Sequence, residues 1–282
     1  MHKLPVFDTI GWAYRFAFLH FVRIFVLAGP PLFIAAVVAF FIQRAELDAQ
    51  IAALQQQGGL LDLSSPKFLL YSIASSVVQA VFTSIAAVAL HRMALFGPQA
   101  GRVSVGRTEA QFMVVWLTFI MVMVFSLTLA LMLGLADPSN PRAAGFAALI
   151  FLVLYIGLIV LVVRLMPIFP HIVATGELSA EHALKLSRGN GWRIFGCFFF
   201  AFLPLPFVLA GADPLALNPN AARMTGPELL AVLSRFRDGL VETSIVLYVF
   251  NVLMTAIGIA LLSYIYKILN GRAVDDLLPE PA

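Results

Sequence analysis

The chain has 282 residues, of which 61% are hydrophobic and only 12% are charged, and its formal net charge is +3. Soluble domains carry about 25% charged residues, so this composition excludes an ordinary soluble protein. Several apolar runs approach or exceed the roughly 20 residues that cross a hydrocarbon core about 30 Å thick. We therefore expect an all-α, polytopic integral membrane protein built as a bundle of transmembrane helices.

The first expected helix, at residues 7–22, precedes the first span. Its apolar residues recur at helical spacing, but Arg15 and Arg23 interrupt them, which favours a helix lying in the membrane interface. The first span follows at residues 24–43. Gly-Pro-Pro at 29–31 is expected to kink or restart this span, because proline lacks a backbone donor. A helical extension then leaves the membrane.

Five more spans are expected along the rest of the chain. They cover residues 68–90, 112–135, 146–163 with an apolar extension to 174, 192–212 and 243–269. Thr225 and Glu228 form a capping-box pattern that opens a short amphipathic helix at 226–239, in the loop before the last span. Residues 1–282 are thus expected to form one membrane domain of six transmembrane helices with short interfacial helices.

Lysine and arginine set the expected orientation, because cytoplasmic loops carry an excess of them. With both termini in the cytoplasm, twelve of the 18 basic residues lie on the cytoplasmic side and six lie outside. We therefore place the chain in a bacterial inner (cytoplasmic) membrane with the N-terminus and the C-terminus cytoplasmic. The basic residues are scattered through the loops, which indicates anionic membrane lipid as the partner and argues against nucleic acid.

The fourth span breaks up where it reaches the cytoplasm. Counted from the start of that span at 1.5 Å per residue, Arg164 lies about 27 Å along, where its side chain can reach the headgroups. Pro167 and Pro170 each remove a backbone hydrogen bond, which predicts a bend. A short helix then begins after Ser179 and ends at Gly189. The predicted order is span, bend, surface helix, span.

This segment, at residues 164–196, resembles one family of proteins. It is similar to the membrane domain of the bacterial membrane-anchored glycerophosphodiester phosphodiesterases and to their six-span relatives. The matching residues are Ala183, Leu184, Ser187, Arg188, Gly189, Trp192, Arg193 and Gly196. The resemblance implies a six-span membrane domain. The catalysis of that family belongs to a separate soluble barrel domain, for which these 282 residues include no candidate, so no catalytic function is expected.

Polar side chains recur at helical spacing on the second and sixth expected spans. The second-span stripe includes Ser76, Gln79 and Thr83, and the sixth-span stripe includes Tyr248, Asn251 and Thr255. Such residues pack membrane helices together through hydrogen bonds worth about 0.6–2 kcal/mol. The same side chains can line a solute path, so the sequence leaves a packing seam and a solute path both open.

A third candidate site is the cytoplasmic rim, where arginines gather near the start of a helix. Helix N-termini present free N–H groups to anions, and the phosphate of an anionic phospholipid is the expected ligand. The alternative is that these residues only fix the topology and extend to the headgroups. The candidate residues are Arg164, Arg188, Asn190, Arg193, Arg102 and Arg107.

No catalytic motif stands out in the chain. Its histidines form no HExxH pattern and Cys197 is the only cysteine, so we expect no metal site and no cofactor. The expected spans contain no acidic residue, which argues against a proton-coupled pump. We interpret His91, beside Arg92, as an anchor at headgroup level.

These patterns predict a non-catalytic membrane scaffold or lipid-associated accessory protein, with its cytoplasmic rim on anionic headgroups. The alternative function is a transporter or exporter of a small or lipid-like solute. A protein partner and the oligomeric state stay open.

Overall fold

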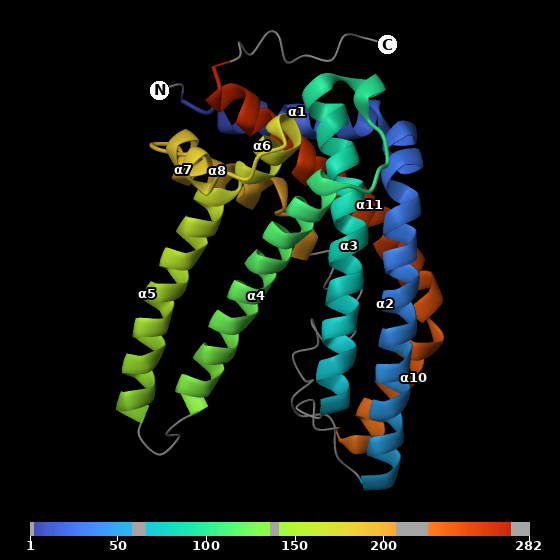
Figure 1. Cartoon of the computed structure of the whole chain (residues 1–282). Coiled ribbons are helices and arrows are strands. Elements are labelled where there is room, and N and C mark those ends of the chain that lie inside the picture. The colour runs from blue at the N-terminus through green and yellow to red at the C-terminus, as the bar shows by residue number, and fades with distance from the viewer. Residues whose placement is uncertain (1–2, 58–65, 136–140, 207–224, 272–282) are drawn as a thin grey trace.

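A computed structural model of the chain describes residues 3–57, 66–135, 141–206 and 225–271 (Figure 1). Every element within those ranges is helical, so the protein is all-α. In chain order the elements are α1 (Val6–Leu19), α2 (Phe21–Gln57), α3 (Pro66–Phe96), the 3-10 turn η1 (Pro98–Ala100), α4 (Arg107–Leu135), α5 (Pro141–Leu165), α6 (Ile168–Thr175), α7 (Ala180–Leu186), α8 (Gly191–Ala201), α10 (Gly226–Asp238) and α11 (Leu240–Leu269).

Four helical stretches in the described ranges are long and apolar enough to cross a membrane. They are Phe21–Gln55, Ile73–Phe96, Phe151–Thr175 and Leu240–Leu269. They correspond to the first, second, fourth and sixth predicted spans, and the third predicted span coincides in position with α4. The described residues therefore make a membrane protein with four candidate spans.

The fifth predicted span, residues 192–212, is not present as one helix in the described residues. Helix α8 has 11 residues, which at 1.5 Å per residue is about 16 Å and only half of a hydrocarbon core. It ends at Phe202, shortly before Pro204 and Pro206. Proline supplies no backbone donor and keeps the preceding residue out of helical geometry, which explains the break. Residues 207–212 lie outside the described ranges.

Helix α5 is apolar on all sides and stands at the margin of the molecule (Figure 1). Four neighbouring residues, Leu152, Val153, Leu154 and Ile156, are 52%, 63%, 64% and 47% exposed. At about 100° per residue, these residues cover more than half of the circumference of the helix. In water such exposure would be costly, whereas lipid solvates an apolar helix all round. The composition of α5 therefore suits a helix in contact with acyl chains.

Helix α1 runs across the ends of the long helices rather than along them (Figure 1). Ala13 faces inward and is fully buried, and the Tyr14 hydroxyl donates to the Ala201 carbonyl of α8 at 2.8 Å. Phe7 and Phe18 are 73% and 62% exposed. A buried face beside an exposed apolar one is what a helix lying in a membrane interface requires.

The hydrophobic core lies at the same end as α1. The C-terminal halves of α3 and α11 supply much of it, and α6 packs against both. Phe169 of α6 is 1% exposed, and its ring centre lies 4.6 Å from that of Phe112 in α4. Because α6 exists only through the break after α5, the predicted bend places a helix in the core.

Helix α2 continues through Pro30 and Pro31, which the sequence analysis expected to kink or restart it. A contact with α11 accompanies this continuity. The Tyr248 hydroxyl donates to the Gly29 carbonyl at 3.0 Å, and a Cβ at Gly29 would lie 3.1 Å from that hydroxyl. Pro30 and Pro31 remove the backbone bonds to the Val26 and Leu27 carbonyls, so the Tyr248 bond joins α2 to α11 beside the prolines without replacing either lost bond.

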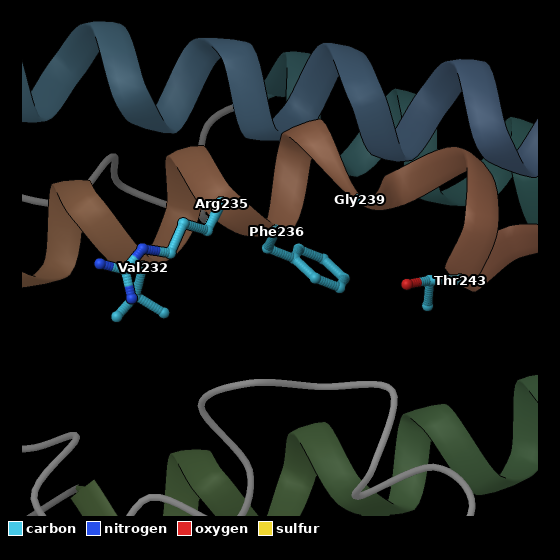
Figure 2. Close-up of a pocket in the computed structure, with 5 residues that line it drawn as sticks. All are labelled: Val232, Arg235, Phe236, Gly239 and Thr243. Atoms are coloured by element: carbon cyan, nitrogen blue, oxygen red, sulfur yellow. The ribbon is translucent and has the colours of Figure 1, made fainter.

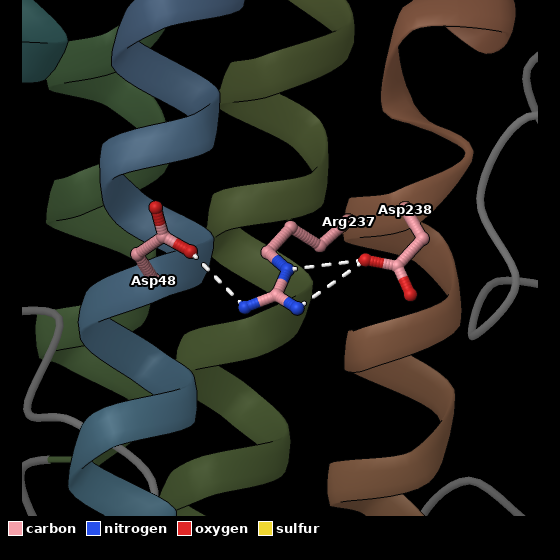
Figure 3. Close-up of polar contacts among 3 residues, drawn as sticks. All are labelled: Asp48, Arg237 and Asp238. Atoms are coloured by element: carbon pink, nitrogen blue, oxygen red, sulfur yellow. Dashed lines mark hydrogen bonds and ion pairs between the residues drawn. The ribbon is translucent and has the colours of Figure 1, made fainter.

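At the opposite end, α10 packs against the second half of α2. Leu47 of α2 and Leu233 of α10 belong to one small apolar cluster. Arg237 of α10 lies 3.6 Å from Asp48 of α2 and 3.3 Å from its neighbour Asp238 (Figure 3). Exposed ion pairs contribute about 0–1 kcal/mol. The apolar contact therefore holds α10 in place, and the Arg237–Asp48 pair adds a weak polar contact to α2.

Candidate functional site

The predicted break after the fourth span is present. Helix α5 ends at Leu165, and α6 ends at Gly176, whose φ of 77° is left-handed and favours glycine. The Ser179 hydroxyl then accepts the His182 N–H at 3.2 Å and caps α7. A second left-handed glycine, Gly189 with φ 76°, separates α7 from α8. These turns bring α7 and the start of α8 to the end of the bundle that α1 crosses.

Two of the predicted rim residues hold the N-terminal segment. The Asn190 Oδ1 atom accepts the Leu4 N–H at 3.1 Å, and Arg193 Nη1 donates to the Leu4 carbonyl at 3.1 Å. We call this pair of bonds the Leu4 clamp. Asn190 is 4% exposed and Leu4 is 1% exposed, so the clamp is buried. It joins the chain just before α1 to the start of α8.

Arg164 links the fourth span to the surface helix. Its Nη2 atom donates to the Leu184 carbonyl of α7 at 3.3 Å. Its aliphatic stem passes Gly191, where an added Cβ would lie 3.4 Å from the Arg164 Cγ. Arg164 is thus close to the residues of the Leu4 clamp, and it connects α5, α7 and the start of α8.

Arg102 lies in the loop between η1 and α4, Arg107 begins α4, and a buried ion pair holds this loop. Arg92 Nη1 lies 2.9 Å from Glu109 Oε1, and the Ser104 hydroxyl accepts from Arg92 at 2.5 Å and donates to Glu109 at 2.6 Å. Glu109 is in the first turn of α4, before the predicted third span. Burial raises the pKa of Glu109, but hydrogen bonds from Ser104 and from its own N–H, together with the Arg92 charge, outweigh this and lower the pKa below its usual value. Glu109 is therefore ionised at neutral pH.

We define the basic rim as the exposed basic side chains at this end that form no ion pair, together with the exposed aromatic residues beside them. Lys185 of α7 is also exposed here, but it pairs with Glu181 at 2.6 Å. The aromatic residues are Trp192, Phe7 and Phe18, which are 73%, 73% and 62% exposed. No member of the basic set forms an ion pair with a residue in the described ranges. The basic side chains are Lys3, Arg15, Arg102, Arg107 and Arg188.

The polar stripe of the second predicted span faces α2. Ser76 and Gln79 line an open groove of about 400 Å³ between α2 and α3, together with Gln43 and Glu46 of α2. Gln79 Nε2 donates to Ser75 Oγ at 3.4 Å, within its own helix. The stripe therefore borders a hollow as well as a helix contact.

Glu46 lies on the helical extension that was predicted to follow the first span. The first predicted span ended at residue 43, whereas the apolar helix of the structure runs over Phe21–Gln55 and includes Glu46. A signal was available in the sequence. Gln43 and Glu46 are three residues apart, which puts them on one face of a helix.

The stripe of the sixth predicted span has a different environment. Tyr248 bonds to Gly29 of α2, while the Thr255 hydroxyl donates to Asn251 Oδ1 at 3.4 Å within α11. Asn251 is exposed, and Thr83 of α3 is half-buried one turn beyond the groove. The bonds of Gln79 and Asn251 therefore run within their own helices, whereas Tyr248 forms a bond between helices, as packing predicts.

His91 is not the headgroup anchor that we expected. It is 0% exposed, and its Nδ1 atom lies 2.8 Å from the Ser263 hydroxyl of α11. The Ser263 hydroxyl donates to the Ile259 carbonyl at 2.8 Å, so His91 Nδ1 carries the proton and donates to Ser263. His171 makes a similar contact, 3.1 Å from the Tyr266 hydroxyl. Both histidines join neighbouring helices to α11 inside the core.

A smaller hollow of about 290 Å³ lies where α10 meets α11 (Figure 2). Val232 and Phe236 line it with apolar side chains, and Gly239 contributes backbone only. Arg235 and Thr243 lie towards its two ends. It lies at the opposite end from the basic rim. None of the predicted site residues lines it.

Within the described ranges, no group of three or more His, Cys, Asp or Glu side chains is placed to hold a metal ion. No protein-family model matches the chain, and neither a curated protein nor a solved structure matches it. Function is therefore inferred from the residues and their geometry.

Proposed function

We propose that the chain is a non-catalytic protein of a bacterial inner membrane, a scaffold or lipid-associated accessory protein whose basic rim contacts anionic headgroups. The observation that supports this most is the set of exposed basic side chains without ion pairs, beside the exposed aromatic residues of α1 and α8. Each Lys or Arg near an anionic surface contributes about 1 kcal/mol, so the five together favour anionic lipid by about 5 kcal/mol before screening by salt.

The Leu4 clamp supports the same proposal through the shape of the rim. It fixes α1 across the end of the bundle, where Phe7 and Phe18 are exposed. Apolar burial and attraction to anionic lipid then act at one surface, the combination that gives stable interfacial binding. The excess of basic residues on this side makes it cytoplasmic, where anionic lipid is concentrated.

The resemblance to the membrane domain of the glycerophosphodiester phosphodiesterases bears on the same segment. Residues 164–196 form the break, α7 and the start of α8, which together carry Arg164 and Arg188. The part of the chain that resembles this family thus contributes Arg188 and Trp192 to the rim.

Native mass spectrometry of the purified full chain with bound phosphatidylglycerol tests this proposal. We expect the wild type to retain the anionic lipid and a combined Arg107→Ala, Arg188→Ala variant to lose it. A matched control, Arg44→Ala with Arg235→Ala, removes two exposed arginines from the opposite end and should retain the lipid. Equal retention by both variants, or no retention by the wild type, would contradict the proposal.

A transporter or exporter of a small or lipid-like solute is the second candidate, and the groove between α2 and α3 favours it. The groove includes Ser76 and Gln79 of the predicted path, whereas Asn251 pairs along its own helix. The Gln79→Ala variant separates the two interpretations. If Gln79 serves packing, the variant has a lower Tm than the wild type. If Gln79 binds solute, the variant keeps the wild-type Tm without ligand but is no longer stabilised by the ligand.

A further inference from the structure

The groove between α2 and α3 differs in chemistry from the surface around it. Three apolar side chains nearby are exposed, as expected of side chains that face lipid: Phe41 of α2 at 64%, Ile73 of α3 at 53% and Val77 of α3 at 45%. The groove itself is lined by a carboxylate, two amides and two hydroxyls, and it measures about 400 Å³. A polar hollow beside lipid-facing residues is a place for a polar ligand. It lies at the other end of the bundle from the basic rim, near the contact of α2 with α10.

Among the described residues that line the groove, Glu46 is the only one with a carboxylate. It forms no ion pair and no hydrogen bond with the side chains that the structure describes. Arg44 is two residues away on the same helix, and residues at that spacing do not face each other. Arg237 of α10, which lies against this part of α2, pairs instead with Asp48 and Asp238. The Glu46 carboxylate therefore lacks a cation from the described chain.

The neighbours of Glu46 offer hydrogen-bond acceptors. Gln79 donates from its amide nitrogen to Ser75, which leaves its carbonyl oxygen as an acceptor. Gln43 and Ser76 add an amide and a hydroxyl from the two facing helices. A carboxylate with several neutral oxygen acceptors matches a group that carries one positive charge and several N–H donors.

We propose that this groove binds a primary ammonium group, with Glu46 supplying the charge and Gln43 and Gln79 accepting N–H bonds. An ammonium group offers three donors. A volume of about 400 Å³ is far larger than the roughly 30 Å³ of one water molecule, so the groove suits an organic amine better than a bare cation. The amine belongs either to a soluble solute or to an ethanolamine lipid headgroup. The inference does not depend on lipid binding at the basic rim.

Thermal unfolding of the purified full chain in a neutral detergent, titrated with ethanolamine, tests the proposal. We expect saturable stabilisation of the wild type. Glu46→Gln keeps the size of the side chain but removes the charge, and should raise the half-saturating concentration by about tenfold or more. The matched control is Glu242→Gln, which removes an exposed carboxylate from the first turn of α11 and should keep the wild-type response.

Two further titrations narrow the ligand. Choline carries the same charge without N–H donors and should stabilise the protein less than ethanolamine. Sodium chloride tests a bare cation. Sodium that stabilises as well as ethanolamine, or an ethanolamine response that Glu46→Gln leaves unchanged, would overturn the proposal. If Glu46→Gln does not fold, Gln43→Leu takes its place, with a weaker ethanolamine response expected and an unchanged one counting against the site.

Native mass spectrometry in mixed phosphatidylethanolamine and phosphatidylglycerol identifies the source of the amine. Phosphatidylethanolamine that the wild type retains and Glu46→Gln loses marks a lipid headgroup. A response to ethanolamine without retained lipid marks a soluble amine. If ethanolamine does not stabilise the protein and the wild type retains no phosphatidylethanolamine, the proposal is overturned. Because the rim variants act on phosphatidylglycerol, failure of the rim proposal is visible separately in the same spectra.

Discussion

Replacing Asn190 by alanine removes the side-chain oxygen that accepts the Leu4 N–H at 3.1 Å. Leu4 is 1% exposed, so water does not readily replace that oxygen. A buried donor left without an acceptor costs about 1–3 kcal/mol. If this cost acts on the docking of α1 against α8, the undocked population rises by about 5- to 150-fold.

Cys197 reports on that docking. It is the only cysteine of the chain, it is fully buried, and its thiol lies 3.8 Å from the Val6 carbonyl at the start of α1. We expect N-ethylmaleimide to alkylate Cys197 of the Asn190→Ala protein about 5- to 150-fold faster than that of the wild type, in a detergent that keeps the protein folded. Arg188→Ala changes an exposed neighbour and should keep the wild-type rate. An unchanged rate in Asn190→Ala would refute the role of the Leu4 clamp.

Three further predictions concern the core and the loop between α3 and α4. The lowered pKa of Glu109 means that its ion pair contributes stability above the ordinary value of 4.5, and that this stability is lost as pH falls through the lower folded value; Tm measured against pH should show this loss in the wild type and not in Glu109→Gln. Ser263→Ala leaves the His91 Nδ1–H without its acceptor and should lower the free energy of unfolding by about 1–3 kcal/mol, measured by chemical denaturation, whereas no loss would mean that the bond is not buried. Tyr248→Phe removes one bond between helices and should cost about 0.6–1.7 kcal/mol in the same assay, while wild-type stability would show that this bond does not hold α11 against α2.

The local features of the fold were predictable from short stretches of sequence. The Ser179 cap and the glycine stop at Gly189 are present, and Glu228 accepts from the N–H and the hydroxyl of Thr225 at 2.8 and 2.9 Å. Such signals depend on residues within a turn of each other, so no knowledge of the tertiary fold is needed. The long apolar runs behave in the same way, because hydrophobic length alone selects a span.

The errors arise where a distant contact decides the outcome. The partner of His91 is 172 residues away, and the residue that bonds to Gly29 beside the α2 prolines is 219 residues away. No local pattern around His91 or around Gly29 reveals these partners. The break in the predicted fifth span has a local cause instead, because the prolines at 204 and 206 interrupt the helix.

In the candidate site too, residue types could be predicted from the sequence, whereas contacts between distant residues could not. The arginines of the predicted rim were visible in the sequence, and the structure brings the helices and loops that carry them to one end of the bundle. The Leu4 clamp was not visible, because it joins residues 186 and 189 positions apart. It shows that Asn190 and Arg193 bind the protein's own backbone. Arg102, Arg107 and Arg188 are left as the exposed members of the predicted set.

Quenching of Trp192 by brominated phosphatidylglycerol tests the lipid contact of the basic rim most directly. Trp192 is 73% exposed and close in sequence to Arg188 and Arg193. The substitutions Trp12→Phe and Trp116→Phe leave Trp192 as the only tryptophan that emits. We predict stronger quenching by brominated phosphatidylglycerol than by brominated phosphatidylcholine, and loss of this preference in the combined Arg107→Ala, Arg188→Ala variant. Equal quenching by the two lipids in the protein that keeps its arginines would contradict the account.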